Sequence, residues 1–384
     1  MMPFDSIRRR SFLKAGAATG TVGLTGLAGC SSITGGGTPE LGLAFTVPVE
    51  NFGSLFAIEE IRNELTNVGS EYELSVTRNE STPDSLNAMA AGEVDLALLS
   101  TVSYASAVTQ EAVPGNISMV ATDFWDAHPE WYGFTIFSRS DSDITEISDL
   151  EGQNVGVNAQ GTGTHAVLRK AARQEGFEYG SDAQIVELPF PTFVSALNDG
   201  RIDAGIFPAL FAVAARSEGF NEVYSSQDLW DEAYPFAFTV GSNDSIDEKS
   251  DAIAAWGEDL AELVEYSYDN RSQVVSLAAE YFELPEPVVD GFFLNQNDYF
   301  RQDITIDFDR LQFAMDELVE LDFLQESFDV GVGSYPGESV RVKLTTTDEA
   351  SLAAAREWLE ARVSLVDEGP TGPSDTEPER DSAE

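Results

Sequence analysis

A short polar stretch, residues 158–165, holds the side chains of this chain best suited to bind a small molecule. It reads Asn-Ala-Gln-Gly-Thr-Gly-Thr-His. Its amide, hydroxyl and imidazole groups can donate hydrogen bonds to an oxyanion, a carboxylate or a heteroaromatic acceptor, and its two glycines let a ligand approach the backbone closely. The candidate ligand-binding residues of this stretch are Asn158, Gln160, Thr162, Gly163, Thr164 and His165.

The same stretch also fits a purely structural role between a strand and a helix. A buried strand is predicted at 154–157, and a helix is predicted to follow the loop and end at Gly176. Thr162 or Thr164 can cap that helix, whose positive dipole end attracts anions. Helix capping alone and ligand binding both remain open here, and His165 equally fits an exposed histidine at a helix start. No nucleotide-binding glycine motif is present.

The loop belongs to a pattern that the chain uses twice, in which short apolar strands alternate with helices. The predicted strands are 41–46, 72–77, 94–99 and 118–123 in the first copy, and 154–157, 184–188 and 202–207 in the second. The helices between them include 55–65, capped by Ser54, and 83–91. This alternation is typical of α/β proteins with helices on both faces of a sheet. The sequence therefore predicts two similar lobes, each with a mostly parallel sheet flanked by helices.

Two aromatic strands, 131–138 and 235–240, are predicted to carry the chain into the second lobe and back. Helices at 249–268, 272–281 and 307–320 are expected on the first lobe. The resulting domain boundaries are 1–30 (export signal), 31–40 (flexible linker), 41–130 plus 236–335 (lobe 1), 131–235 (lobe 2), 336–365 (extension with a helix) and 366–384 (acidic tail, expected to be disordered).

The N-terminus has the features of an export signal. Residues 8–14 read Arg-Arg-Arg-Ser-Phe-Leu-Lys, a twin-arginine pattern, and 27–30 read Leu-Ala-Gly-Cys, which resembles a lipobox. Cys30 is the only cysteine, so no disulfide is expected within the chain. We expect lipid attachment at Cys30 and a position at the outer face of the cell membrane, with an uncleaved N-terminal anchor as the alternative.

The charge balance excludes one class of partner. The formal net charge is −46, and the only lysines are Lys14, Lys170, Lys249 and Lys343. Such a composition is typical of proteins from extreme halophiles, where concentrated salt screens self-repulsion. Nucleic-acid binding needs a basic surface, so it is excluded as a function.

Four segments carry a resemblance to a known family: 27–30, then Ala-Gly-Glu-Val-Asp-Leu-Ala at 91–97, Asp-Leu-Glu-Gly-Gln-Asn-Val-Gly-Val at 149–157, and Leu-Asn-Asp-Gly-Arg-Ile-Asp-Ala at 197–204. Over about residues 41–335 the chain resembles the solute-binding lipoproteins of ABC importers, of the nitrate/taurine/sulfonate and thiamine-precursor type. That family has a type II periplasmic-binding-protein fold.

The resemblance implies two lobes that close on one small organic or oxyanion ligand and deliver it to an ABC permease with its ATPase. By position, it adds further candidate binding residues at the carboxyl ends of strands: Asn51, Phe52, Ser100, Thr101, Thr192 and Phe207. Phe52 also fits a hydrophobic staple. No cofactor, no metal and no catalytic residue are expected, and the receptor is expected to be a monomer.

Other functions are weighed against this one. The receptor of a tripartite (TRAP-type) transporter has a similar Gly-rich loop, and a cell-surface sensor module is a third option. A thiamine-precursor-synthase-like enzyme needs a cysteine-rich motif that this chain lacks. His128 has no second histidine or cysteine nearby to form a metal site. Trp125, Trp131 and Tyr132 either stack on a ligand or fill the core between the lobes.

Overall fold

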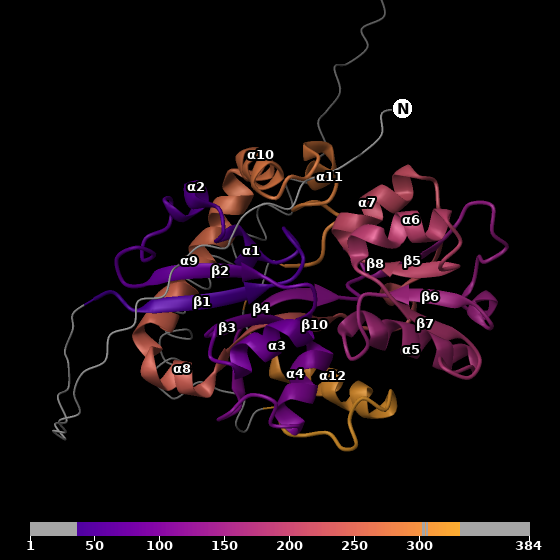
Figure 1. The fold of residues 1–384 in the computed structure, drawn as a ribbon, viewed down its shortest axis with the longest axis horizontal. Helices are drawn as coiled ribbons and strands as arrows, with labels where there is room; N and C mark the ends of the chain where they lie inside the picture. Colours follow the sequence, from indigo (N-terminus) through magenta and orange to yellow (C-terminus); the bar gives the residue numbers. More distant parts are fainter. Residues whose placement is uncertain (1–36, 302–303, 305, 331–384) are drawn as a thin grey trace, which may run out of the picture. The chain divides into compact units, whose positions relative to one another are not determined.

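The chain folds around two five-stranded sheets (Figure 1). The structure is a computed structural model, and it describes residues 37–301, 304 and 306–330. The first sheet has the order β2-β1-β3-β10-β4. Its strands are β1 (Glu40–Phe45), β2 (Glu73–Arg78), β3 (Leu96–Ser100), β4 (Ile117–Asp126) and β10 (Tyr234–Ser242).

The second sheet has the order β7-β6-β8-β5-β9. Its strands are β5 (Thr135–Ser138), β6 (Asn154–Val157), β7 (Gln184–Glu187), β8 (Ala204–Phe207) and β9 (Asn221–Ser225). The predicted strands of both copies are therefore confirmed to within a few residues. The α/β class, with two sheets flanked by helices, is confirmed as well.

Each sheet is mixed, and the antiparallel part comes from the strands beside the crossings. β1 pairs in parallel with β2 and β3, and β6 pairs in parallel with β7 and β8. β10 is antiparallel to β3 and β4, and β5 is antiparallel to β8 and β9. β10 and β5 each enter their sheet from the other sheet and run antiparallel to their neighbours. Parallel pairing is therefore limited to three strands in each sheet.

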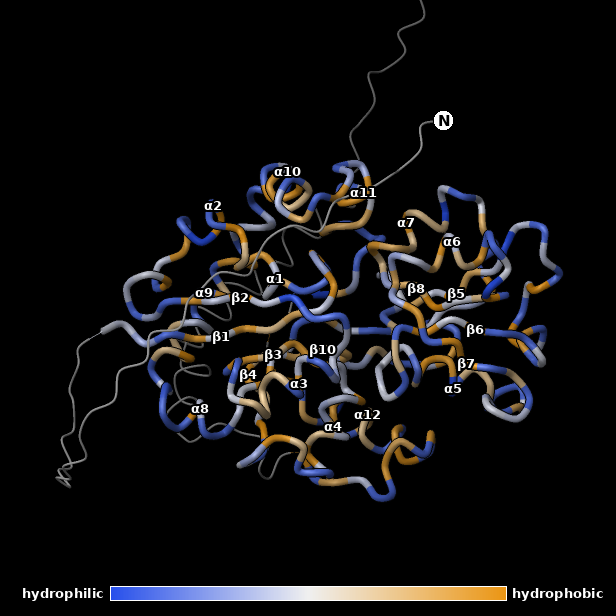
Figure 2. The backbone as a smooth tube through the Cα atoms, in the orientation of Figure 1, coloured by the Kyte–Doolittle hydropathy of each residue, from blue (hydrophilic) through white to orange (hydrophobic). Residues whose placement is uncertain are grey.

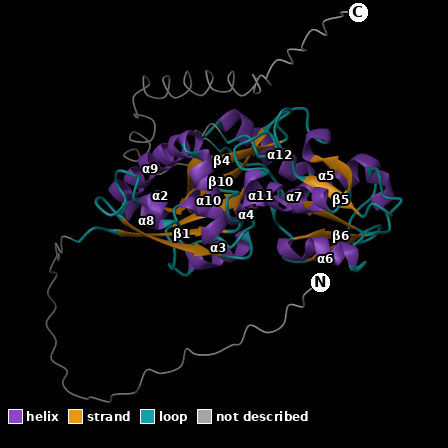
Figure 3. Ribbon diagram, turned by 90° about the horizontal axis from the view of Figure 1, so that it is seen from above, coloured by secondary structure: helices purple, strands orange, loops and turns teal. Residues whose placement is uncertain are grey.

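Helices cover both faces of the two sheets (Figures 1 and 3). In Figure 1, α6 and α7 lie on one side of the second sheet and α5 on the other. The helices are α1 (Phe52–Leu55), α2 (Glu59–Arg62), α3 (Thr82–Ala90), α4 (Thr101–Thr109), α5 (Gly163–Glu175), α6 (Phe193–Asn198), α7 (Ala209–Ser217), α8 (Asn243–Glu248), α9 (Ser250–Asp269), α10 (Arg271–Tyr281), α11 (Glu286–Asp290) and α12 (Phe308–Glu320), with short 3-10 turns η1 (Ile147–Leu150), η2 (Phe190–Thr192) and η3 (Ser226–Asp228).

The prediction of one continuous helix over 55–65 is wrong. The segment forms two single turns, α1 and α2, because Ile58 between them has extended backbone, with φ −89° and ψ 115°. This break allows Phe56, Ile58 and Ile61 all to be buried. Ser54 does not cap a helix over 55–65. Its hydroxyl accepts a hydrogen bond from the amide of Val49 and donates to a backbone carbonyl.

The hydropathy pattern explains how the helices pack. Hydrophobic residues follow the strands and the inner sides of the helices, and hydrophilic residues gather in the outer loops (Figure 2). α5 ends at Gly176 in the left-handed conformation with φ +81°, as the sequence predicts. Among the described helices, none has the length and apolar content needed to cross a bilayer. The predicted signal, Cys30, the extension and the acidic tail lie outside the described residues.

Candidate ligand-binding cleft

A cleft of about 380 Å³ opens where strands of both sheets end. One side follows β1 and β2, and the other follows β7 and the start of α7. The lining residues are Thr46, Val47, Arg78, Asn79, Glu80, Pro189, Phe190, Pro191 and Phe211. Ligands of open α/β sheets bind outside the carboxyl ends of the strands, so this cleft lies where such a site is expected. Its volume falls in the range of small-molecule sites.

Arg78 supplies the positive charge of the cleft. It is the last residue of β2, and its Nε donates to the carbonyl of Thr46 at 3.1 Å. Burial lowers the pKa of its guanidinium, whereas nearby Glu80 raises it. Within the described part of the chain, Arg78 forms no ion pair. The sequence analysis missed this residue, although a basic side chain at the end of a predicted strand in so acidic a chain is a usable signal.

An aromatic wall faces the same space. The rings of Phe190 and Phe211 stack with centroids 5.6 Å apart and an interplanar angle of 26°. Phe193 supports Phe190 from behind, with ring centroids 5.4 Å apart. Pro189 and Pro191 flank Phe190 in the lining. The cleft therefore joins a guanidinium to an apolar surface.

The structure brings together the polar residues of loop 158–165, which bond mainly to one another. Thr164 donates to the side-chain oxygen of Asn158 at 2.8 Å. Thr162 lies at the N-cap of α5, but its hydroxyl bonds to Asn158 and to the carbonyl of Ala159 and makes no capping bond. Gln160 is exposed, and its backbone amide donates to Glu187. These bonds shape the loop, and a ligand contact remains a prediction for each of these residues.

Gly163 contacts the first sheet directly. Its amide donates to Oγ of Ser100 at 3.2 Å, and Oγ of Ser103 donates to the carbonyl of Gly161 at 3.3 Å. Thr101 donates to the carbonyls of Pro235 and Phe236, each at 2.9 Å. In this arrangement the amide at the start of α5 is paired within the protein. The space lined by Thr101, Gly163 and α12 measures only about 20 Å³, enough for about one water molecule.

His165 is buried and stabilises this loop. Its Nδ1 accepts from the amide of Gly161 at 3.1 Å, and its ring packs edge-on against Phe323 with centroids 5.1 Å apart. Burial and the nearby charge of Arg169 lower the pKa of His165 to about 4, so the imidazole is neutral at pH 7. Only 9% of His165 is exposed, so the alternative of an exposed histidine at a helix start is wrong. A ligand contact of His165 remains a prediction.

The remaining candidate residues lie in the interior or make local bonds. Phe52 and Phe207 are fully buried among other rings, and the side-chain amide of Asn51 bonds to Asp123. Thr192 donates to the carbonyl of Pro189, next to the cleft. A ligand role remains a prediction for all four, and Thr192 is the one nearest the open space.

A cluster of buried charges surrounds Arg301. Arg301 is 1% exposed, bonds to Asp298 and donates to the carbonyl of Val49 at 3.2 Å. Burial would lower its pKa, but Asp298 and Asp123 raise it. Burial raises the pKa of Asp123 to about 6 and that of Glu50 to about 8. One cation therefore serves three carboxyl groups, and Glu50 is protonated at neutral pH.

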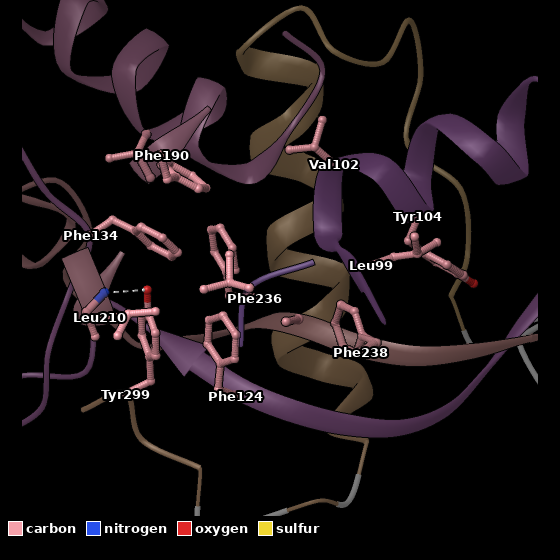
Figure 4. Close-up of a cluster of buried hydrophobic side chains, with 14 of the residues drawn as sticks. Leu99, Val102, Tyr104, Phe124, Phe134, Phe190, Leu210, Phe236, Phe238 and Tyr299 are labelled. Atoms are coloured by element: carbon pink, nitrogen blue, oxygen red, sulfur yellow. Dashed lines mark hydrogen bonds between the residues drawn. The ribbon is translucent and has the colours of Figure 1, made fainter. Parts of the chain in front are cut away.

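Tyr299 joins this cluster to the start of α7. Its hydroxyl donates to Glu50 at 3.0 Å and accepts from the amide of Ala209, at the start of α7, at 3.2 Å. Its ring stacks on Phe124 with centroids 4.1 Å apart, and Phe134 and Phe236 complete the group (Figure 4). These rings fill the core beside the two crossings. Tyr132 joins them by packing edge-on against Tyr299.

Glu50 is expected to make stability fall as pH rises. The ordinary pKa of this carboxyl is 4.5, and in the folded protein it is about 8. Between these values the folded chain holds a proton that the unfolded chain has released, so the Glu50 contribution falls by up to about 1.4 kcal/mol per pH unit. Glu50→Gln keeps an acceptor for Tyr299 but cannot titrate. Denaturant titrations across this interval should give a flatter pH profile for Glu50→Gln; identical slopes for both proteins would contradict the assignment.

A transition-metal site finds no support in the described residues. They contain no group of three or more histidine, cysteine or carboxylate side chains placed to hold an ion. His128 stacks on Phe300 with centroids 4.7 Å apart, and its Nδ1 accepts from the amide of Glu130. His128 is therefore packed against an aromatic ring and is not part of a metal cluster.

Solved structures define the class of this fold. A sulphonate-binding periplasmic protein from Escherichia coli matches with a TM-score of 0.60 and 20% identity, covering 76% of this chain and 90% of its own. The nitrate-binding protein NrtA from Synechocystis PCC 6803 matches with a TM-score of 0.61 and 14% identity, covering 86% and 91%. At this identity the likeness shows the fold alone. The fold is that of the type II periplasmic binding proteins.

A family model also matches part of the chain. The NMT1-like family matches residues 56–230, which include loop 158–165. The resemblance in fold to periplasmic solute-binding proteins is confirmed by the solved structures. A search of curated protein sequences gave no significant match. One structural neighbour is an enzyme: a cysteine-to-serine variant of DszB in complex with biphenyl-2-sulfinic acid, with a TM-score of 0.55 and 16% identity, covering 80% of this chain and 99% of its own.

Proposed function

We propose that the protein is an extracytoplasmic solute receptor of an ABC importer, which closes on a small organic or oxyanion ligand and delivers it to a membrane permease. The observation that carries this proposal is the cleft at the strand ends of both sheets, with Arg78 on one side and Phe190 on the other. The family match and the sulfonate- and nitrate-binding neighbours support the same role.

Ligand binding works by closure of two lobes, 41–130 plus 236–335 and 131–235. The hydrogen bonds from Gly163 to Ser100 and from Ser103 to Gly161 are contacts of the closed arrangement. A ligand that touches both walls of the cleft stabilises that arrangement by differential contacts. The permease then distinguishes the closed receptor from the open one.

The N-terminal signal supplies the location in this proposal. Twin-arginine export delivers the folded chain, and a lipid on Cys30 holds it at the outer face of the cell membrane. The linker 31–40 separates the anchor from the folded body. The acidic composition suits a halophilic cell, and the receptor acts as a monomer.

A thermal-shift screen in concentrated salt tests the function. The panel holds sulfonates, taurine, nitrate, bicarbonate, pyrimidines and phosphonates. A true ligand at a hundredfold excess over its Kd should add about 2.7 kcal/mol of stability. Absence of any shift across the panel would count against a receptor for this class of solute. Neighbouring genes for an ATPase and permease, in place of a TRAP membrane pair, would support the ABC partner.

An enzyme is the second candidate, because DszB shares the fold. The single cysteine of this chain is Cys30, which lies in the predicted signal. Incubation of the panel compounds with the protein, followed by product analysis, separates the two functions. Turnover of any compound would overturn the receptor assignment.

A further inference from the structure

We propose that the ligand of the cleft is a singly charged organic anion with an apolar body, such as an aryl or alkyl sulfonate or carboxylate, and not a small inorganic oxyanion. This inference rests on the proposed function and names its substrate class. It is carried by three features of the cleft: a free guanidinium, a stacked aromatic pair and a volume larger than an inorganic anion needs.

The charge of Arg78 is available to a ligand. Among the described basic residues, all form ion pairs except Arg62, Arg78 and Arg201. Of these three, only Arg78 lines the cleft. Its Nε is held by the carbonyl of Thr46, which fixes the side chain and leaves the two terminal nitrogens without a partner among the described residues. A fixed guanidinium binds a sulfonate or carboxylate through two parallel hydrogen bonds.

Glu80 limits the charge of that head group. It lines the same cleft, and its charge raises the pKa of Arg78, so the two side chains interact. A carboxylate beside the guanidinium repels a second negative charge on the ligand. The pair therefore favours a monoanion over sulfate or another dianion.

The opposite wall fits an apolar body. Phe190 and Phe211 present a stacked pair of rings, with Pro189 and Pro191 beside them. An inorganic oxyanion gains nothing from such a surface, whereas a ring or alkyl chain buries apolar area against it. The cleft measures about 380 Å³, and nitrate, with four heavy atoms, would leave most of it to water. Organic anions of about ten heavy atoms use both the charge and the wall.

The test is a calorimetric comparison of organic and inorganic anions in concentrated KCl, where chloride competes equally with all of them. Benzenesulfonate, hexanesulfonate and benzoate form the organic set, and nitrate and sulfate form the inorganic set. Benzyl alcohol is the uncharged control. We expect at least one organic anion to bind tenfold or more tightly than either inorganic anion and than benzyl alcohol. Benzenesulfonate against benzoate distinguishes the two head groups.

Three variants locate the contacts. Arg78→Gln should weaken binding of the organic anion at least tenfold. Arg201→Gln changes an unpaired arginine outside the cleft lining and should leave that binding affinity unchanged. Phe211→Ala should weaken binding of benzenesulfonate at least tenfold and change the affinity for nitrate less than threefold. Both Arg78 and Arg201 are exposed, so their replacement leaves the core intact.

The outcomes separate this inference from the receptor function. If nitrate binds as tightly as the organic anions and Phe211→Ala has no effect, the inference is overturned and the receptor function stands. Equal affinity for benzyl alcohol and benzenesulfonate would show that Arg78 does not bind the anionic group; this result would also overturn the inference and leave the receptor function standing. If no organic anion binds, the inference fails, and the wider thermal-shift panel then decides the receptor function separately.

Discussion

Gly163→Val is expected to abolish ligand binding. A Cβ atom at this position would lie 2.7 Å from Cε2 and 2.8 Å from Cε1 of Phe236, and closer still to Cζ. Phe236 belongs to β10 of the first sheet, is 5% exposed, stacks on Phe124 and packs at a tilt against Phe134. The side chain added by the substitution therefore forces the loop away from Ser100, or displaces a core ring at a cost of about 1–3 kcal/mol.

The melting temperature of Gly163→Val should also fall, because the contact lies within the aromatic group between the sheets. Calorimetry with the tightest-binding anion of the comparison above measures ligand affinity, and a thermal melt measures stability. A double-mutant comparison tests the steric cause. Gly163→Ala should lower the melting temperature and the ligand affinity much less in a protein that already carries Phe236→Ala than in the unmodified protein. Full affinity in Gly163→Val would exclude the loop from the closed arrangement.

Arg301→Met is expected to cost about 3–5 kcal/mol of unfolding free energy, because it removes the cation from a buried group of carboxyls. Asp298 and Asp123 then lose the charge that stabilises their ionised forms. The guanidinium also lies 5.3 Å from the ring centroid of Phe52, so packing is lost too. Since buried charges are weakly screened, the loss should persist in concentrated salt.

Denaturant titrations of Arg301→Met measure this loss, and the pH dependence gives its cause. At low pH the carboxyls are protonated and the deficit should shrink. Arg310→Met is the matched control, because the partly exposed Arg310 pairs with the exposed Glu232 and should contribute at most about 1 kcal/mol. Equal losses in the two variants would contradict the special role of the buried cluster.

The regular elements were predictable because local pattern and tertiary packing agree. Apolar runs mark β1, β3 and β8, and Gly176 ends α5 in the only region of backbone conformation that favours glycine. Residues 55–65 were not predictable in the same way. Their apolar spacing fits a helix, but burial of Phe56, Ile58 and Ile61 is achieved by two turns with an extended residue between them.

The candidate site was predictable only in part. The sequence places loop 158–165 after a strand, and the structure confirms this position, but spacing along the chain cannot show that the amide of Gly163 pairs with Ser100. Arg78 was not predicted because no local motif marks the end of β2 as part of a cleft whose other wall comes from residues more than 100 positions away. The partnership of Glu50, Tyr299 and Arg301 joins residues about 250 positions apart, which no local pattern reveals.

The two crossings place a mechanical constraint on the protein. β4 and β10 pair along their length, from Asp126 opposite Tyr234 to Ile117 opposite Ser242. The chain leaves the first sheet at Asp126 and re-enters it at Tyr234, so both crossings lie at the same end of this pair. In the proposed closure, these two linked strands allow rotation of one lobe about a single axis and resist twisting or sliding. Amide protons of this ladder should therefore exchange slowly with solvent even while the contact between Gly163 and Ser100 breaks and re-forms.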